Sequence, residues 1–168
     1  MKNITSILPG LFIILLVLGC GFLGNLGIVV KIDELNTTMS PKTAVADVQN
    51  GSFAIANYEL SINESEITKT NNLRKPAEED QILITFKVNG IFGGSDVEQG
   101  KFRAKNISWF HVYYYKNGNL HEKALNDFEG FVLLPKFAAN DTDILGALDI
   151  TDGSTSLKGG FTATKIGK

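Results

Sequence analysis

The stretch from residue 107 to residue 125 constrains the fold more than any other part of the sequence. Its first half alternates two bulky sets of side chains, with Ser108, Phe110, Val112 and Tyr114 on one face and Ile107, Trp109, His111, Tyr113 and Tyr115 on the other. Asn117-Gly118 follows. Asn-Gly between apolar runs predicts a two-residue hairpin, because both central residues of a type I′ turn need a positive φ. We expect a central strand that is covered on both faces and returns through residues 120–125.

Further short runs of β-branched and aromatic residues show the same period of two. The cleanest spans residues 82–88, and others span residues 53–62, 128–134, 144–150 and 156–166. The phase slips by one near Ala56-Asn57, as at a strand bend or a β-bulge, and Gly159-Gly160 predicts a bend in the last run. Helical periodicity does not persist beyond about two turns after residue 35. The pattern predicts an all-β fold, an antiparallel immunoglobulin-like β-sandwich over residues 52–168.

The N-terminal segment differs in composition from the rest of the chain. Residues 7–30 include 17 hydrophobic residues among 24, whereas the whole chain is 43% hydrophobic. Lys2, the apolar run 11–18 and Gly19-Cys20-Gly21 follow the order of an export signal: a charged start, an apolar stretch and small residues. A helix this apolar on every side has no polar face to turn to solvent. The segment therefore predicts export or membrane insertion.

Val17-Leu18-Gly19-Cys20 resembles a bacterial lipobox, whose cysteine becomes lipidated and N-terminal after cleavage. Residues 1–19 would then be a lipoprotein-type signal peptide, and Cys20 would carry the membrane lipid anchor. The alternative is an uncleaved membrane anchor that includes residues 20–30, because the stretch 7–30 exceeds the about 20 residues that cross a bilayer.

Both alternatives place the remainder of the chain outside the cell. The positive charge at Met1 and Lys2 keeps the N-terminal end on the inner side of the membrane. Residues 31–51 are rich in turn and loop formers and are expected to be a tether. We therefore expect an extracytoplasmic domain, residues 52–168, that is anchored to the cell membrane.

Three segments carry a resemblance to a known family. After the lipobox-like start come YELSINESEITK, QILITFKVN and FHVYYYKNGNLHEKAL, within residues 50–125. In this order they resemble the telokin-like, immunoglobulin-fold lipoproteins of unknown function found mainly in Gram-positive bacteria. The resemblance implies the sandwich fold and the lipid anchor, and it implies no catalytic residues. Residues 141–150 depart from the family, which usually has a Pro-Gly turn before a final aromatic strand.

Charge and composition exclude several classes of function. The chain has 16 Lys and Arg against 18 Asp and Glu, a net charge of -2, and no basic stretch for nucleic acid. A single Cys excludes a disulfide framework and a four-thiolate zinc site. His111 and His121 lack metal-ligand spacing, and His111 is expected to pack or hydrogen-bond within its strand. Nucleophile-elbow and phosphate-binding glycine motifs are absent from the sequence, so we expect neither an enzyme nor a cofactor site.

Two groups of residues are candidates for ligand contacts. Trp109, Tyr113 and Tyr115 would form an exposed aromatic row that stacks on a sugar ring or a partner protein, unless loops cover both faces of their strand. Oxygen ligands suited to Ca²⁺ would gather at one end of the sandwich from Asp141, Asp143, Asp149 and Asp152. The same aspartates also belong to ordinary turn sequences.

Two surface features complete the set of candidates. Asn-x-Ser/Thr sequences mark candidate glycosylation sites at Asn36, Asn63, Asn106 and Asn140, although an asparagine-rich chain also produces this pattern by chance. Lys101, Arg103 and Lys105 alternate along the approach to the aromatic strand, which is typical of a solvated sheet edge that resists aggregation.

Together these features predict a membrane-tethered β-sandwich lipoprotein that acts as a non-enzymatic binding or interaction module. Its partner would be a cell-wall component, a surface protein or a small ligand. The alternative is a pilin-like subunit of a surface filament, which also joins an apolar N-terminal helix to a β-rich head. The glutamate that such subunits carry near the fifth mature position is missing from this sequence.

Overall fold

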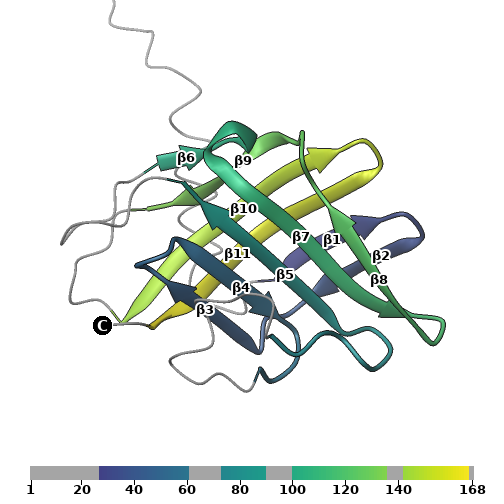
Figure 1. Cartoon of the computed structure of the whole chain (residues 1–168). Helices are drawn as coiled ribbons and strands as arrows, with labels where there is room; N and C mark the ends of the chain where they lie inside the picture. The colour runs from purple at the N-terminus through teal and green to yellow at the C-terminus, as the bar shows by residue number, and fades with distance from the viewer. Residues whose placement is uncertain (1–26, 61–72, 90–99, 136–141, 167–168) are drawn as a thin grey trace, which may run out of the picture.

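The computed structural model describes residues 27–60, 73–89, 100–135 and 142–166, and these residues form an all-β fold (Figure 1). The strands are β1 (Ile28–Ile32), β2 (Leu35–Met39), β3 (Thr43–Asp47), β4 (Ser52–Ala56), β5 (Ile82–Val88), β6 (Gly100–Phe102), β7 (Ile107–Lys116), β8 (Asn119–Ala124), β9 (Glu129–Leu134), β10 (Asp143–Asp152) and β11 (Thr155–Ile166). One 3-10 turn, η2 (Ala104–Asn106), precedes β7. The predicted all-β class is confirmed.

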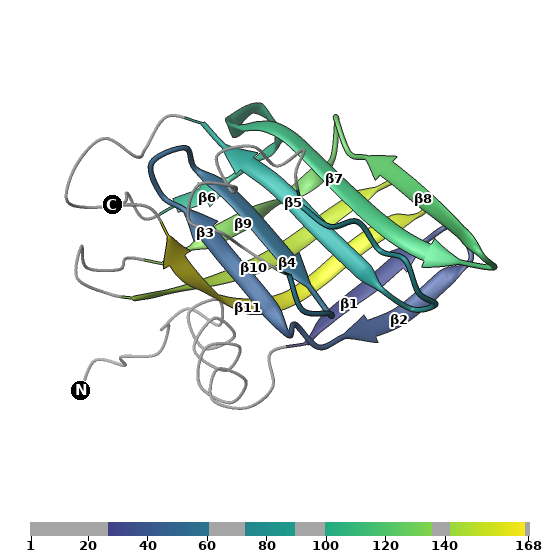
Figure 2. The ribbon, with the colours of Figure 1, turned by 60° about the horizontal axis from the view of Figure 1, so that its bottom comes forward.

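The strands form one curled sheet whose halves lie as two layers over a common core (Figure 2). The order is β6-β9-β10-β11-β3-β4-β5-β7-β8, and the β1-β2 hairpin adds to β11. β11 joins the two layers, because residues 156–159 pair with β1 whereas residues 164–166 pair in parallel with β3. The change of partner follows the predicted bend at Gly159-Gly160. Gly159 has a φ of 152°, and a Cβ there would lie 2.1 Å from the Gly27 carbonyl oxygen.

Phenylalanines from both layers meet in the core. Phe86 stacks on Phe53 and Phe110 at centroid distances of 4.8 and 5.2 Å. Phe161 of the opposite layer meets Phe53 and Phe86 edge-on, 6.2 Å from each. All four side chains are fully buried, and each such burial stabilises the fold by roughly 1.5–3 kcal/mol. Gly146 faces Phe161 across the β10-β11 pair and leaves room for its ring.

The strongest hairpin prediction is confirmed. Asn117 and Gly118 have φ values of 53° and 74°, as a type I′ turn requires, and Lys116 pairs with Asn119. β7 lies between β5 and β8, and β5 covers the residues predicted for it. The runs predicted at 128–134, 144–150 and 156–166 correspond to β9, β10 and β11.

Residues 31–51, expected as a tether, instead contribute to the sheet. β2 and β3 lie wholly within this range, and β1 begins at Ile28, inside the segment assigned to the anchor. The reason is a short period-two pattern, because Ile28, Val30 and Ile32 alternate with exposed neighbours and are fully buried. The folded domain therefore starts well before Ser52.

The strand bend or β-bulge predicted near Ala56-Asn57 corresponds to the end of β4. Phe53 and Ile55 point into the main core, whereas Tyr58 and Leu60 join a second apolar cluster on the outer face of the sheet. The apparent slip near Ala56-Asn57 is thus a change of face at the end of β4. The register instead shifts between Lys87 and Val88, opposite β7.

This shift changes the predicted faces of β7 at its start. Val88 pairs with Ile107 and Lys87 with Trp109, so that Ser108 is the extra residue. Ile107 therefore packs against the core, and exposed Ser108 donates its hydroxyl hydrogen to the Asn89 side chain. From Phe110 onward the alternation follows the prediction, with Phe110, Val112 and Tyr114 buried.

The second apolar cluster covers part of the outer face of the layer that contains β3, β4 and β5. Its members are Val45, Ala54, Ala56, Tyr58, Leu60, Leu73 and Leu83. The Tyr58 hydroxyl donates to the Arg74 carbonyl, which fixes residues 73–75 above the sheet. This contact places Lys75 next to β7.

Within the described residues, no helix has the length and apolar character needed to cross a membrane. The predicted signal peptide 1–19, the lipidation site Cys20 and residues 21–26 of the predicted anchor lie outside the described part of the chain.

Candidate binding surface on the outer face of β7

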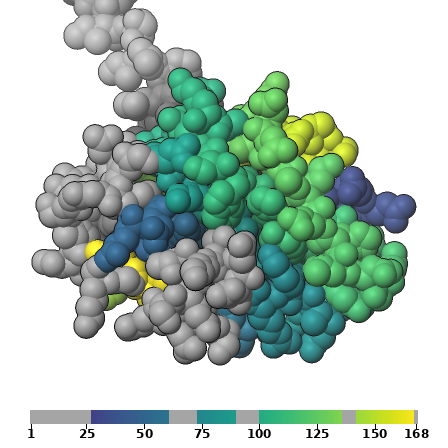
Figure 3. All heavy atoms as spheres, in the orientation of Figure 1, coloured from purple at the N-terminus to yellow at the C-terminus, as the bar shows by residue number. Residues whose placement is uncertain are grey.

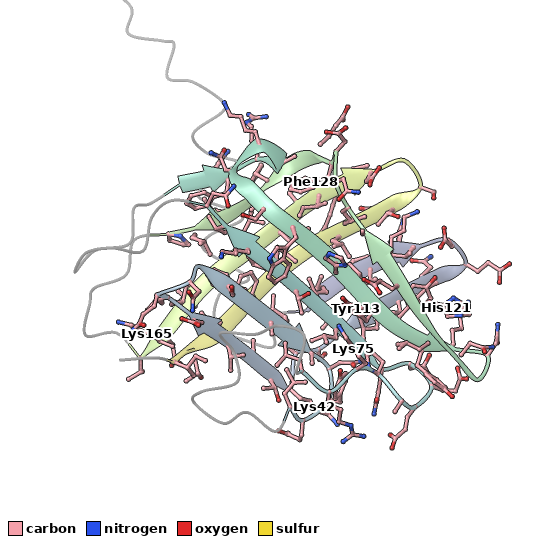
Figure 4. All side chains as sticks on the ribbon, in the orientation of Figure 1. Lys42, Lys75, Tyr113, His121, Phe128 and Lys165 are labelled. Carbon is pink, nitrogen blue, oxygen red and sulfur yellow. The ribbon has the colours of Figure 1, made fainter. Side chains whose placement is uncertain are left out.

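The outward-pointing residues of β7 form an aromatic row along the strand. Trp109 and His111 have ring centroids 6.1 Å apart at an interplanar angle of 65°, and His111 stacks on Tyr113 at 5.9 Å and 11°. All three side chains are half-buried. The face seen in Figure 3 is the one to which β7 and β8 contribute, and Figure 4 shows Lys75 beside Tyr113 on this side of the sheet. Of the residues predicted for an exposed aromatic row, Trp109 and Tyr113 thus lie in one half-buried row with His111 between them.

Glu122 of β8 connects the row through hydrogen bonds. The hairpin register places Glu122 directly opposite Tyr113. His111 donates from Nδ1 to Glu122 Oε1 over 2.7 Å, and the Tyr113 hydroxyl also bonds to this carboxylate. The hydrogen bond from His111 is the main cause that holds the pKa of Glu122 below its ordinary value of 4.5. Burial opposes this effect, and the hydrogen bond from Tyr113 adds to the lowering. The expectation that His111 is a packing or hydrogen-bonding histidine is confirmed, and its hydrogen-bond partner lies on the neighbouring strand β8.

Lys75, from the segment that precedes β5, also contacts the aromatic row. Its Nζ lies 3.1 Å from the centroid of the Tyr113 ring, a cation–π contact. Burial lowers the pKa of Lys75, and the charge of Glu122 opposes this effect. Burial raises the pKa of Tyr113 to about 12, with further contributions from the bond to Glu122 and its charge. The cluster therefore holds an ammonium, a phenol and a carboxylate side by side on the surface.

The residues of the row differ in how many contacts they already make, and therefore in how accessible they are to a ligand. The Tyr113 ring is engaged by both His111 and Lys75. Trp109 contacts His111 only at a steep angle, and its indole N–H has no hydrogen bond within the described residues. The side chain of Glu122 is 52% exposed. We therefore define the candidate binding surface as Trp109, His111 and Glu122, with Tyr113 and Lys75 as its support.

Tyr115, the third predicted contact, lies beyond this surface. Its hydroxyl donates to the Gly118 carbonyl 2.9 Å away, within its own hairpin. Its cross-strand partner is Leu120, which is 48% exposed. Tyr115 therefore supports the turn, because its polar end is committed to the backbone there.

The aspartates predicted to gather at one end of the fold are spread along one strand. Asp143 begins β10 and Asp152 ends it, about 30 Å away at 3.3 Å per residue. Asp149 forms an ion pair with Lys158 on β11 at 3.2 Å. In the described part of the chain, no three His, Cys, Asp or Glu side chains lie close enough to hold a metal ion. The structure therefore does not bring Asp143, Asp149 and Asp152 together at one end of the fold, and Asp141 lies outside the described residues.

The remaining candidates are distributed over separate elements. Asn36 is exposed on the edge strand β2, and Asn106 is half-buried in η2, where its backbone is hydrogen-bonded to Arg103 and Asn89. Asn63 and Asn140, like Cys20, lie outside the described residues. Lys101 lies on the edge strand β6, as a solvated edge predicts, but Arg103 and Lys105 do not continue that strand because η2 interrupts it.

Sequence reasoning missed two members of the site, Glu122 and Lys75. A signal for Glu122 was present, because a two-residue turn at Asn117-Gly118 fixes the pairing of Tyr113 with Glu122. Lys75 had no such signal, since it reaches the row from a segment that is remote in sequence and held by Tyr58.

No family model, curated protein or solved structure matches the chain.

Proposed function

We propose that the protein is a membrane-tethered, extracytoplasmic β-domain lipoprotein that works as a non-enzymatic binding module. The observation that carries this proposal is the polar network on the outer face of β7, where Glu122 links His111 and Tyr113 beside a half-exposed Trp109. The main core is already filled by the opposite face of the same strand. Aromatic and charged side chains ordered on a surface that the core does not need are typical of a recognition site.

The proposal that the protein is tethered to the membrane rests on the sequence. Residues 7–26 are apolar, and Val17-Leu18-Gly19-Cys20 resembles a lipobox. The immunoglobulin-like arrangement remains part of the proposal, supported by two layers over one aromatic core. The continuity of the sheet through β11 is a departure from the two separate sheets of that fold.

The surface is suited to a ligand with both an apolar face and hydroxyl groups, such as a cell-wall sugar. The indole of Trp109 can stack on the ring of a sugar, because C–H groups of the sugar contact the negative π face. The exposed Glu122 carboxylate accepts hydrogen bonds from hydroxyl groups. A surface protein with an apolar anchor side chain and a donor group is the other partner that this chemistry admits.

Trp109 is the only tryptophan of the chain, so its fluorescence reports on the site directly. We expect soluble cell-wall fragments, titrated into the full-length protein in detergent, to shift or quench this emission. Glu122→Gln should weaken the effect, because the carboxylate loses its charge. Tyr115→Phe is the matched control, since Tyr115 lies on the same strand but bonds only within its hairpin. Unchanged emission, together with no retention of the wild-type protein on isolated cell envelopes, would refute the binding proposal.

One observation favours the filament alternative. β1 begins at Ile28, directly after the apolar segment, as when an apolar helix runs straight into a β-rich head. Extraction distinguishes the two functions: a lipoprotein leaves the membrane in mild detergent as a monomer, whereas a filament subunit sediments as an assembly. A sedimenting assembly would replace the binding-module proposal with the structural one.

A further inference from the structure

The early start of β1 leaves almost no tether between the anchor and the folded domain. With the sheet starting at Ser52, a lipidated Cys20 could stand off by as much as about 110 Å of extended chain. With β1 starting at Ile28, only residues 21–27 separate Cys20 from the sheet, a reach of roughly 25 Å. A domain of this size measures roughly 35–40 Å across, so the surface around Gly27 must stay close to the bilayer. An uncleaved anchor that ended at Leu26 would hold the domain closer still.

The strand register shows which residues surround Gly27. Ile28 pairs with Gly159, so Gly27 enters the sheet at the level of Gly160. Gly160 pairs with Ala147, Ala147 with Leu133 and Leu133 with Lys101. These positions alternate with the buried residues of β11, β10, β9 and β6, so they point away from the core. Gly27 therefore enters the sheet at the level of these outward-pointing positions, in the layer formed by β1, β11, β10 and β9.

The outer face of this layer carries apolar side chains on both sides of the Lys158–Asp149 ion pair. We define them as the apolar patch: Val29, Phe131, Leu133, Leu145 and Ala147. Val29 is 40% and Leu145 39% exposed, and the other three are half-buried. Among the described residues, only Val29, Leu145 and Leu120 are large hydrophobic side chains with this much exposure. Two of the three thus lie on the outer face of the layer that contains β1, whereas Leu120 lies on the opposite layer, on β8.

The charges on this face favour an apolar contact over an electrostatic one. Lysines and carboxylates balance, with Lys31, Lys101 and Lys158 against Glu129, Asp143 and Asp149. Lys158 pairs with Asp149, and Lys101 extends over the ring of Phe131 with its Nζ 4.5 Å from the centroid. A lysine in this position can keep its ammonium group in water while its stem and the ring contact the lipid surface.

We infer that the apolar patch rests on the lipid surface of the membrane to which the protein is tethered, and that the candidate binding surface of β7 faces away from it. The inference rests on the proposed function, since it requires the membrane anchor. It assigns the two outer faces of the sheet to two partners, the bilayer on one side and the ligand on the other.

Site-directed spin labelling of the full-length protein in phosphatidylcholine vesicles tests this inference. Nitroxides are placed by Leu145→Cys and by Thr162→Cys, whose parent residue is exposed and pairs with Leu145. The matched control is Leu120→Cys, a leucine of similar exposure on the opposite layer. The unsubstituted protein, whose single cysteine is Cys20, gives the background labelling.

We expect residues 145 and 162 to lose accessibility to a water-soluble nickel complex when vesicles are present, and residue 120 to keep it. The loss should persist in high salt, because the charges on this face balance.

Equal accessibility at residues 145 and 120 in protein that floats with the vesicles would overturn the orientation and leave the tether intact. Protein that does not float with the vesicles would overturn the tether itself, and the orientation with it. Spin–spin broadening at residue 145 would show that a second copy of the chain covers the patch instead of lipid, and this would also overturn the inference.

Discussion

The inner and outer faces of β7 are both aromatic, yet they serve different purposes. The inner residues Phe110 and Val112 are fully buried in the main core, where Phe110 stacks on Phe86 of the neighbouring strand. The outer residues Trp109, His111 and Tyr113 are half-buried and linked by polar groups from Glu122 and Lys75. The bulk of the side chains is similar on the two faces and therefore does not indicate which face is the core. The polar cross-strand partner marks the face that is available for binding.

The largest effect expected from this comparison is on the inner face. Phe110→Ala removes a ring that stacks on Phe86 and meets Phe128 edge-on, so the free energy of unfolding should fall by about 3–5 kcal/mol. Urea unfolding followed by far-UV circular dichroism measures the change. Phe110→Leu is the control, since it keeps most of the apolar volume and should cost clearly less.

On the outer face, Trp109→Ala should lower the free energy of unfolding by only about 1 kcal/mol, because the indole is half-buried and packs against a single ring. The same urea titration applies, with Phe110→Ala as the reference. A loss as large as that of Phe110→Ala would show that Trp109 is a core residue and would remove the basis for a binding surface.

Glu122→Gln should have a smaller effect on stability, below about 1 kcal/mol, because both the carboxylate and His111 are partly exposed to water. Thermal unfolding at low and high salt checks this expectation. Added salt should reduce the difference between the two proteins, since it screens the surface pair. If the difference in thermal stability between the two proteins does not change with salt, Glu122 stabilises the fold by packing and not by its charge.

The finest test of the network is the titration of Glu122. Its pKa lies below 4.5 in the folded protein, so folding favours the ionised form. The stability that this group contributes is therefore present above about pH 4.5 and is lost as the pH falls through the lowered pKa. Carbon-detected NMR of the side-chain carboxyl group should give a midpoint below 4.5, and His111→Ala should raise it. A midpoint that is the same in both proteins would contradict the hydrogen bond between His111 and Glu122.

Sequence patterns were most reliable where a local rule set the structure. The period of two in residues 82–88 and the Asn117-Gly118 turn predicted β5 and the β7-β8 hairpin correctly. They were least reliable where tertiary pairing decided the outcome. β1 and β2 are short, β2 carries few apolar residues, and the two strands are stabilised by pairing with each other and with β11. Nothing within residues 31–51 indicated that distant partner, because the pairing is with residues more than a hundred positions away.

The candidate site shows the same division. Trp109 and Tyr113 were identified from alternation along one strand, whereas the contribution of Lys75 depends on the Tyr58–Arg74 contact that holds its segment over the sheet. Asp143, Asp149 and Asp152 are close in sequence but were separated because they lie on one extended strand. Closeness along the chain becomes closeness in space only when the backbone turns.

The sequence alone indicates an apolar N-terminal segment and an all-β remainder that contains an aromatic hairpin. These properties follow from composition, from period-two alternation and from the φ angles that Asn-Gly accepts, all of which are local. The tertiary structure decided where the domain begins, which face of β7 is buried, and which faces of the sheet stay open. It decided them because strand pairing and burial join residues that no local pattern relates, as when β11 leaves β1 at Gly159 and continues beside β3.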